Sequence, residues 1–259
     1  MKKLLVWTLI CALCLSLLGA AAADGTLKVG VRTDIPNFGS ISADSGRHYG
    51  LEIDIAEAMA SLMGYSDIEY VDVGVGDRFS LLESGEVDML VACVTITEER
   101  QELYDFTAGY YTDQSVVMVE DSSCFTGVRD LKGAYIGVVS ETNANQLTRV
   151  LNSAAVVVGY DDRSESPYLH VTGVTFMVAE NYTQLDEWLE DGTVDAICLD
   201  GCFSAPYLTE GRSLLPTSLP RQKYGVVTRK GSDLSAKAAE AMDALIADGT
   251  IDALTDKWD

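Results

Sequence analysis

Apolar residues along this 259-residue chain recur at two spacings, which predict alternating strands and helices. Short apolar runs at 27–31 and 134–138 are typical of buried strands. Segment 52–63 instead carries apolar residues every three or four positions and ends before Gly64, which predicts an amphipathic helix with a glycine cap. Alternation of this kind is typical of an α/β fold. The same reasoning predicts strands at 89–92, 116–119 and 225–228, and helices at 181–189, 234–247 and 250–258.

One unit of this pattern occurs twice at the same separation. L-E-S-G-E-V-D at 82–88 and L-E-D-G-T-V-D at 189–195 each predict a helix end, a glycine cap and a buried strand. Their glycines are 107 residues apart, and so are Gly30 and Gly137 in two other predicted strands. The G-x-V-D pattern is common, so coincidence is the alternative. One separation at two landmarks favours two lobes of similar α/β build.

The first 23 residues have the features of a signal peptide. A basic start (M-K-K), an apolar run at 4–18 and three alanines at 21–23 occur in the expected order. An uncleaved anchor is the alternative, but the apolar run is short for a bilayer span. Cys14 follows Cys-Ala-Leu, which is no convincing lipidation signal. We therefore expect export to the periplasm or the cell exterior without a lipid anchor.

Charge and cysteine content narrow the classes of partner. The formal net charge is −22, which excludes nucleic acid as a partner because the chain cannot neutralise phosphates in bulk. A site for an anionic ligand must therefore supply its own cations. The cysteines after the leader contain no C-x-x-C, which argues against a zinc ribbon, while an oxidising compartment permits disulfides whose pairing stays open. The four cysteines after the leader are Cys93, Cys124, Cys198 and Cys202. We expect no cofactor and no metal.

The run A-C-V-T-I-T-E-E-R at 92–100 carries the main candidate chemistry. A buried strand opens into a threonine-rich turn that ends in Arg100, whose guanidinium suits a carboxylate as a bidentate pair. The alternative is a helix start capped by Thr97, with a solvated arginine. Asp200 follows the counterpart strand of the second half. Ligands in open α/β sheets bind at the carboxyl ends of strands, so Arg100 and Asp200 can face each other as a complement to a zwitterion.

Several motifs in order resemble the bacterial extracellular solute-binding proteins, family 3, which are polar amino-acid receptors of ATP-driven importers. The resemblance covers 26–150 and 181–259. It implies an α/β, two-lobed periplasmic-binding-protein-like fold (type II), with two hinge crossings and a ligand cleft between the lobes. The motifs are G-L-E-I-D-I-A (50–56), L-E-S-G-E-V-D (82–88), T-I-T-E-E-R (95–100), D-F (105–106), Y-Y (110–111), D-L-K-G (130–133), V-D-A-I-C-L-D (194–200) and K-W (257–258).

Domain limits follow from the same resemblance and from the repeat. After the signal peptide at 1–23, lobe 1 is expected at 25–109 and 223–259 and lobe 2 at 116–218. The hinge is expected at the crossings 109–115 and 219–224. Segment 152–180 fits the pattern least and is interpreted as a loop or hairpin insertion, because Gly, Asp, Ser and Pro are frequent at 159–167.

The resemblance also implies roles for residues that match the family's motifs. Arg100, assisted by Thr95, is expected to hold the ligand α-carboxylate, and Asp200 the ammonium. The carbonyl of Cys93 also serves, at a position where relatives often have glycine or serine. In the second lobe, Thr142 and Asn143 belong to a loop that replaces a glycine-rich turn, and Glu141 there stands where glycine is usual, which bears on the side-chain contacts.

A second run, R-T-D-I-P-N-F-G at 32–39, is similar to that of glutamate- and glutamine-type receptors, and Asp77-Arg78 resembles their N-R pair. Arg32 and Arg78 are candidates for an acidic ligand side chain; structural salt bridges are the alternative. Phe38 is expected either on the ligand stem or in the core.

The expected function is binding of a polar amino acid, glutamate or glutamine being favoured, and delivery to the membrane permease of an ABC importer by a monomeric receptor. Catalysis is not expected. Two alternatives remain. Cyclohexadienyl dehydratases share this architecture with an added general acid, a role open to Glu141; turnover of prephenate or arogenate separates the two. A ligand-sensing module is the other; we expect no transmembrane helix or catalytic domain after the second lobe, which argues against this alternative.

Overall fold

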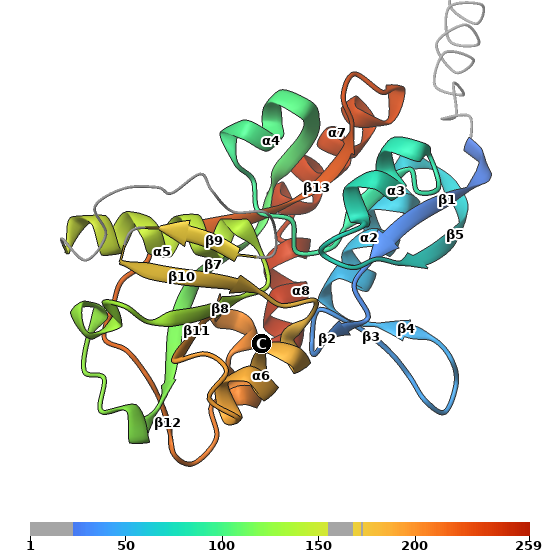
Figure 1. The fold of residues 1–259 in the computed structure, drawn as a ribbon. Coiled ribbons are helices and arrows are strands. Elements are labelled where there is room, and N and C mark those ends of the chain that lie inside the picture. Colours follow the sequence, from blue (N-terminus) through green and yellow to red (C-terminus); the bar gives the residue numbers. More distant parts are fainter. Residues whose placement is uncertain (1–22, 155–167, 172) are drawn as a thin grey trace, which may run out of the picture.

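The computed structural model describes residues 23–154, 168–171 and 173–259, in which β7 (Tyr104–Glu120) connects two sheets (Figure 1). Its first part pairs with β13 and its second part, from Ser115, pairs with β11. Nine strands of the described residues thus lie on one hydrogen-bonded path that changes partner within β7, and β12 branches from it by pairing with β7. Except for Ala23, the predicted signal peptide lies outside the described residues. Within the described part of the chain, no helix has the length and apolar character needed to cross a membrane.

The first sheet has the order β5-β1-β6-β13-β7. β1, β5 and β6 are parallel, whereas β13 lies antiparallel between β6 and β7. Its strands besides β7 are β1 (Ala23–Val31), β5 (Tyr65–Asp72), β6 (Met89–Val91) and β13 (Arg221–Arg229).

The second sheet has the order β7-β11-β8-β10-β9, and β12 pairs with the end of β7. β8, β10 and β11 are parallel to one another, and β9 and β10 form an antiparallel pair. The bounds are β8 (Tyr135–Val138), β9 (Tyr168–Val171), β10 (Val174–Val178), β11 (Ala196–Asp200) and β12 (Arg212–Leu214).

Helices complete the same unit in each half. In the first, α2 connects β1 to β5 after the short strands β2 to β4, and α3 follows β5; in the second, α5 follows β8 and α6 follows β10. The spatial order β5-β1-β6 matches β10-β8-β11, so the predicted two-lobed fold with repeated α/β build is confirmed. The helices are α2 (Leu51–Met63), α3 (Arg78–Ser84), α4 (Glu98–Leu103), α5 (Glu141–Ser153), α6 (Tyr182–Glu190), α7 (Asp233–Ala247) and α8 (Thr250–Trp258).

Smaller elements lie at the rims. β2 (Asp34–Ile35), β3 (Gly39–Ile41) and β4 (His48–Tyr49) form a separate antiparallel sheet before α2. Single 3-10 turns occur at Asp121–Ser123, Val128–Leu131, Gly201–Phe203 and Ala205–Tyr207. Of the predicted insertion at 152–180, the described part contributes β9 and β10, while residues 155–167 and 172 lie outside the described residues.

The apolar core follows the alternation of each strand. In β6, Met89 and Val91 belong to the cluster that packs against α2, whereas Leu90 between them faces a second cluster on the side of α3. Two glycines leave room for neighbouring side chains. A Cβ on Gly30 would lie 2.7 Å from Leu90 Cδ2, and one on Gly137 would lie 2.6 Å from Leu185 Cδ1. The 107-residue repeat of these glycines therefore has a packing cause.

The helix ends follow the predicted chemistry. Gly64 and Gly85 end α2 and α3 with φ of 84° and 81°, which glycine adopts without strain. Thr97 caps α4 by accepting the N–H of Arg100 at 3.2 Å. Asn181 caps α6 in the same way, although Gln184 returns its side chain to the N–H of Glu180 at 2.7 Å instead of to that of Asn181.

The two predicted hinge crossings fall on β7 and β13, which run through the middle of the molecule (Figure 1). The ladder between them is irregular between Tyr224 and Gly225. The lobe limits and the hinge itself stay predictions.

Candidate functional site

A cavity lies where the carboxyl ends of parallel strands from both sheets meet. Arg32 directly follows β1, Asp200 ends β11, and Val139 directly follows β8. Sites in open α/β sheets form at this edge because the strands end there and loops and helix starts supply the side chains. The first-sheet side contributes Arg32, Val75, Arg78, Cys93, Thr95 and Arg100, and the second-sheet side contributes Val139, Ser140, Thr142, Tyr182, Asp200 and Phe203.

The cavity therefore contains most of the residues that the sequence singled out. Phe38 and Asn143 are not among the lining residues. Asn143 is buried behind Asp200 and donates to its Oδ1 at 2.8 Å. The predicted residues that line the cavity are Arg32, Arg78, Cys93, Thr95, Arg100, Thr142 and Asp200.

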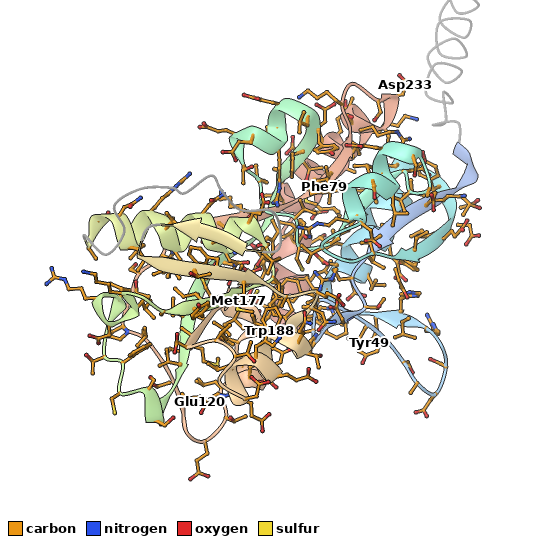
Figure 2. The ribbon with its side chains drawn as sticks, in the orientation of Figure 1. Tyr49, Phe79, Glu120, Met177, Trp188 and Asp233 are labelled. Atoms are coloured by element: carbon orange, nitrogen blue, oxygen red, sulfur yellow. The ribbon has the colours of Figure 1, made fainter. Side chains whose placement is uncertain are left out.

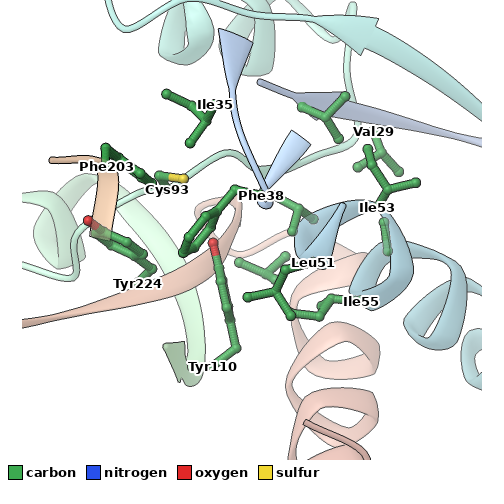
Figure 3. Close-up of a cluster of buried hydrophobic side chains, with 14 of the residues drawn as sticks. Val29, Ile35, Phe38, Leu51, Ile53, Ile55, Cys93, Tyr110, Phe203 and Tyr224 are labelled. Carbon is green, nitrogen blue, oxygen red and sulfur yellow. The ribbon is translucent and has the colours of Figure 1, made fainter. Parts of the chain in front are cut away.

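Phe38 is a core aromatic. It is 4% exposed, and its ring centroid lies 4.9 Å from that of Tyr111 and 5.0 Å from that of Phe203, both in edge-to-face geometry. Figure 3 shows it with Phe203 and Tyr224 on one side and Leu51 on the other. Of the two interpretations of this residue, the structure supports core packing, and Phe38 supports the cavity wall through Phe203.

Arg100 combines both interpretations of its segment. It lies in the first turn of α4, which Thr97 caps, and its side chain still lines the cavity. Nη1 donates to the carbonyl of Thr95 at 2.9 Å, and the guanidinium lies 5.4 Å from the ring centroid of Phe79, a residue of α3 that is labelled in Figure 2. Burial lowers the pKa of Arg100, and the charges of Glu141 and Glu99 partly oppose this. Among the described residues, no carboxylate oxygen lies within 4.0 Å of its nitrogens.

Asp200 is the matching anion on the opposite side. It is 9% exposed and accepts hydrogen bonds from Asn143 Nδ2 at 2.8 Å and Gln222 Nε2 at 2.6 Å. In the described part of the chain, no Lys or Arg nitrogen lies within 4.0 Å of it. Burial, with the nearby charge of Asp113, raises the pKa of Asp200, and the two amide donors oppose the rise. The carboxylate is thus hydrogen-bonded but lacks a cation.

The other two arginines differ in how their charge is balanced. Arg32 forms two hydrogen bonds with Asp34, from Nε at 2.7 Å and from Nη2 at 2.5 Å. Burial alone would lower the pKa of Arg32, but Asp34 outweighs it and the pKa is raised. Arg78 donates from Nη1 to the carbonyl of Ala92 at 2.7 Å, and its buried Nε has no partner in the described residues. Burial and the charges of Arg100 and Arg32 lower the pKa of Arg78 to about 10.

Cys93 holds an uncommon backbone conformation at the cavity edge, with φ of 49°. Its N–H donates to Glu52 Oε1 at 2.6 Å, and the hydroxyl of Tyr110 donates to the same oxygen. Glu52 is fully buried, which raises its pKa although these hydrogen bonds oppose the rise. All four cysteines after the leader, Cys93 among them, have free thiols in the structure.

Sequence reasoning missed several residues of the site. Val139 and Ser140 follow the predicted strand at 134–138, so the rule about carboxyl ends of strands, applied to that strand, would have found them. Tyr182 is the first residue after Asn181, which was predicted to cap a helix, so the start of that helix marked its position. Glu52 lies in the G-L-E-I-D-I-A motif, but it was expected only as a helix residue. Gln222 had no signal, because it only precedes a predicted strand. Tertiary contacts bring both to the site.

Comparison with known proteins places the chain in a family. The profile of the bacterial extracellular solute-binding proteins, family 3, matches residues 27–259. The chain is 31% identical over 266 residues to the L-arginine-binding protein of Pseudomonas aeruginosa, covering 100% of this chain and 96% of the relative. It is 27% identical to the ABC transporter glutamine-binding protein GlnH of Bacillus subtilis, covering 93% of this chain and 84% of the relative.

Solved structures of amino-acid-binding proteins also align with most of this chain. An ancestral arginine-binding protein bound to arginine aligns with a TM-score of 0.73 at 27% identity, covering 90% of this chain and 98% of that one. A structure of an ancestral arginine-binding protein bound to glutamine aligns with a TM-score of 0.72 at 26% identity, covering 90% and 97%. With a profile that matches from β1 to the last residue, this chain belongs to the bacterial extracellular solute-binding proteins, family 3.

Proposed function

We propose that this protein binds an α-amino acid outside the cytoplasm. The observation that carries the proposal is that Arg100 and Asp200 line one cavity from opposite sheets, and neither has a partner of opposite charge within 4.0 Å among the described residues. A buried charge without a counter-ion is costly, and an α-amino acid supplies both counter-ions at once. The α-carboxylate pairs with Arg100, and the ammonium pairs with Asp200.

The cavity charges favour an acidic or amide side chain on that amino acid. Three guanidinium groups and one carboxylate line the cavity; Asp34 balances Arg32 from its side. Once the ligand's α-carboxylate and ammonium have paired, Arg78 still lines the cavity, and no carboxylate of the described residues lies within 4.0 Å of its nitrogens. Glutamate supplies one, and glutamine supplies a carbonyl acceptor.

A cationic side chain fits this charge pattern poorly, although one relative is named for arginine. Such a side chain would add a fourth positive group near Arg78, whose pKa burial and the other two arginines already lower to about 10. Other relatives are named for glutamine and for cystine. The family therefore hosts several ligands, and the charges of this chain's own cavity are the better guide.

Delivery to a permease completes the proposal. Relatives named as ABC transporter proteins support an importer as partner. In the proposed mechanism the lobes, 25–109 with 223–259 and 116–218, close over the ligand about the crossings at 109–115 and 219–224. Closure excludes water, so both ion pairs strengthen as the local dielectric falls. The closed surface is then what the permease recognises.

Isothermal titration calorimetry of the purified chain against the twenty amino acids tests the ligand class. We expect binding of glutamate or glutamine and none of lysine or arginine. Tight binding of an apolar or cationic amino acid alone would remove the side-chain assignment and leave the α-amino-acid site. Binding of none of the twenty would remove both.

Arg78→Met separates the side-chain contact from the rest of the site. Removing one partner of a buried charge pair costs about 2–5 kcal/mol, so glutamate should bind at least about 30-fold more weakly, and glutamine should lose less. Arg149→Met, the same change at an exposed position of α5, is the matched control. An unchanged ratio of glutamate to glutamine affinity in Arg78→Met would show that Arg78 does not contact the side chain.

A further inference from the structure

Gln222 is the centre of a buried polar network that lies behind the cavity. It is 4% exposed, belongs to β13, and does not line the cavity. Its Nε2 donates to Asp200 Oδ1 at 2.6 Å and to Asp113 Oδ2 at 3.2 Å. Its Oε1 accepts from Thr95 Oγ1 at 3.0 Å and from Gln146 Nε2 at 3.0 Å.

The partners fix which way this amide points. Two carboxylates face Nε2, and an ionised carboxylate can accept hydrogen bonds but cannot donate them. A flipped amide would bring its oxygen against the oxygens of Asp200 and Asp113, so the side-chain nitrogen must face them. Oε1 is therefore an acceptor toward Thr95, whose single hydroxyl proton is committed to it. Thr95 Oγ1 can therefore act only as a hydrogen-bond acceptor toward the cavity.

One side chain thus bonds to a cavity residue from each sheet. Thr95 follows β6 of the first sheet, and its backbone bridges to Tyr224 of β13. Asp200 ends β11 of the second sheet. β13 belongs to the first sheet, so the bond from Gln222 to Asp200 spans the two sheets at the point where β7 changes partner.

Asp113 gives this arrangement a second support. It accepts the N–H of Cys202 at 3.0 Å, that of Gly201 at 3.2 Å and the hydroxyl of Tyr224 at 3.1 Å. These bonds hold the turn after Asp200 against β7 and β13. Gln222 lies between the two carboxylates and donates to both, which offsets their mutual repulsion in a buried place.

We infer that Gln222 is a positioning residue for the ammonium half of the ligand site, and this rests on the proposed amino-acid function. It keeps Asp200 and Thr95 as two acceptors aimed at one point, without touching the ligand. Its removal should weaken the recognition of the α-ammonium group specifically. Asp200 would lose a donor and Thr95 would lose the acceptor that orients its hydroxyl, while Arg100 and Arg78 keep their own contacts.

The test compares two ligands that differ only at the α-amino group. Calorimetry measures the affinity of L-glutamate and of L-2-hydroxyglutarate, or, if the wild-type chain prefers another amino acid, of that amino acid and its α-hydroxy analogue. The affinity for the amino acid divided by the affinity for its hydroxy analogue measures how strongly the site recognises the ammonium group. We expect Gln222→Met to lower this ratio at least tenfold. Gln101→Met, the same change at an exposed position of α4, should leave it unchanged.

Gln222→Glu provides a second variant of nearly the same shape, for the case in which Gln222→Met does not fold. It replaces the donor with a group that repels Asp200 and Asp113, so the ratio should fall at least as far. If either folded variant keeps the wild-type ratio, the inference is wrong, even where both ligands bind more weakly, because an equal loss marks a merely structural role. If the wild-type chain binds no amino acid, the proposed function fails first, and this inference falls with it.

Discussion

The backbone N–H of Cys93 donates to Oε1 of Glu52 at 2.6 Å, although the two residues lie 41 positions apart. The bond joins the loop after β6 to the first turn of α2 beneath the cavity floor. It fixes Cys93 in a left-handed conformation that a residue with a side chain rarely adopts. A buried acid of the core thus shapes the edge of the ligand site.

Glu52→Gln should remove a pH dependence of stability. The folded-state pKa of Glu52 is raised above its unfolded value of about 4.3. Its contribution to stability is therefore complete below that value and is lost as pH rises through the folded pKa, by up to about 1.4 kcal/mol per pH unit. Glutamine keeps the acceptor for Cys93 but cannot ionise. The difference in unfolding free energy between variant and wild type, from urea titrations between pH 4 and 8, should grow in favour of the variant.

A flat difference across that range would contradict the assignment, because the acid would then titrate alike in both states. Other groups with raised pKa, such as Asp200, contribute equally to both proteins, so the comparison isolates Glu52.

Arg100→Ala and Asp200→Ala should each abolish most ligand binding with little change in the melting temperature of the free protein. Each removes one member of a buried ion pair that forms only with ligand, so the loss is several kcal/mol. The rise in melting temperature that ligand gives the wild type should disappear. Scanning fluorimetry with and without ligand measures both effects, with Arg149→Ala as control. Full ligand stabilisation of both mutants would mean that the carboxylate and ammonium sites were misassigned.

Arg78→Met should make the ligand-free protein more stable. The guanidinium is 3% exposed, has one carbonyl partner, and is repelled by two other arginines. Replacing a buried charge that lacks a counter-ion by an apolar side chain of similar length should raise the unfolding free energy by about 1 kcal/mol or more. Urea denaturation without ligand measures the gain. A loss of stability would indicate that two contacts of Arg78 outweigh the cost of burial: its bond to Ala92 and its position 5.5 Å from the ring centroid of Phe79.

Gly30→Ala and Gly137→Ala should each destabilise the fold by about 1–3 kcal/mol, because the added methyl would overlap Leu90 or Leu185. The two sites lie in different sheets and share no contact residue, so the double mutant should lose the sum of the two effects. Chemical denaturation of the three variants gives these values. A double mutant that loses much less than the sum would mean that one change relaxes the site of the other.

The fold was largely predictable because its main features produce local patterns in the sequence. The apolar stripe of α2, the glycine ends of α2 and α3 and the 107-residue repeat all have a direct cause in the structure. β5 and α5 were missed. β5 has no buried residue and so no clean apolar alternation. α5 starts at Glu141, with Ser140 as its cap, in a segment for which the sequence predicts only a loop.

The residues that line the site could be predicted from motifs, but the residues that contact them from behind could not. Arg100, Asp200 and Arg78 stand at positions that strand ends or family motifs mark, and they do line the cavity. Motifs do not report what lies behind a residue. The partners that set the chemistry of these groups, such as Asp34 for Arg32 or Gln222 for Asp200, are determined by packing between segments far apart in the chain. Phe38 shows the converse, since its motif position suited a ligand contact while its ring lies in the aromatic cluster.

The place of β13 has a consequence for how the molecule is made. β13 (Arg221–Arg229) lies between β6 and β7 in the sheet, yet it is synthesised long after both, since β6 ends at Val91 and β7 at Glu120. While the chain emerges from its N-terminus, β6 and β7 present unpaired edges that invite pairing with other chains. The second sheet, from β7 to β11, has all its strands by Asp200, apart from the short β12. The last-made segment therefore closes the first-made sheet, and a chain cut before β13 would hold a finished second sheet beside an open first one.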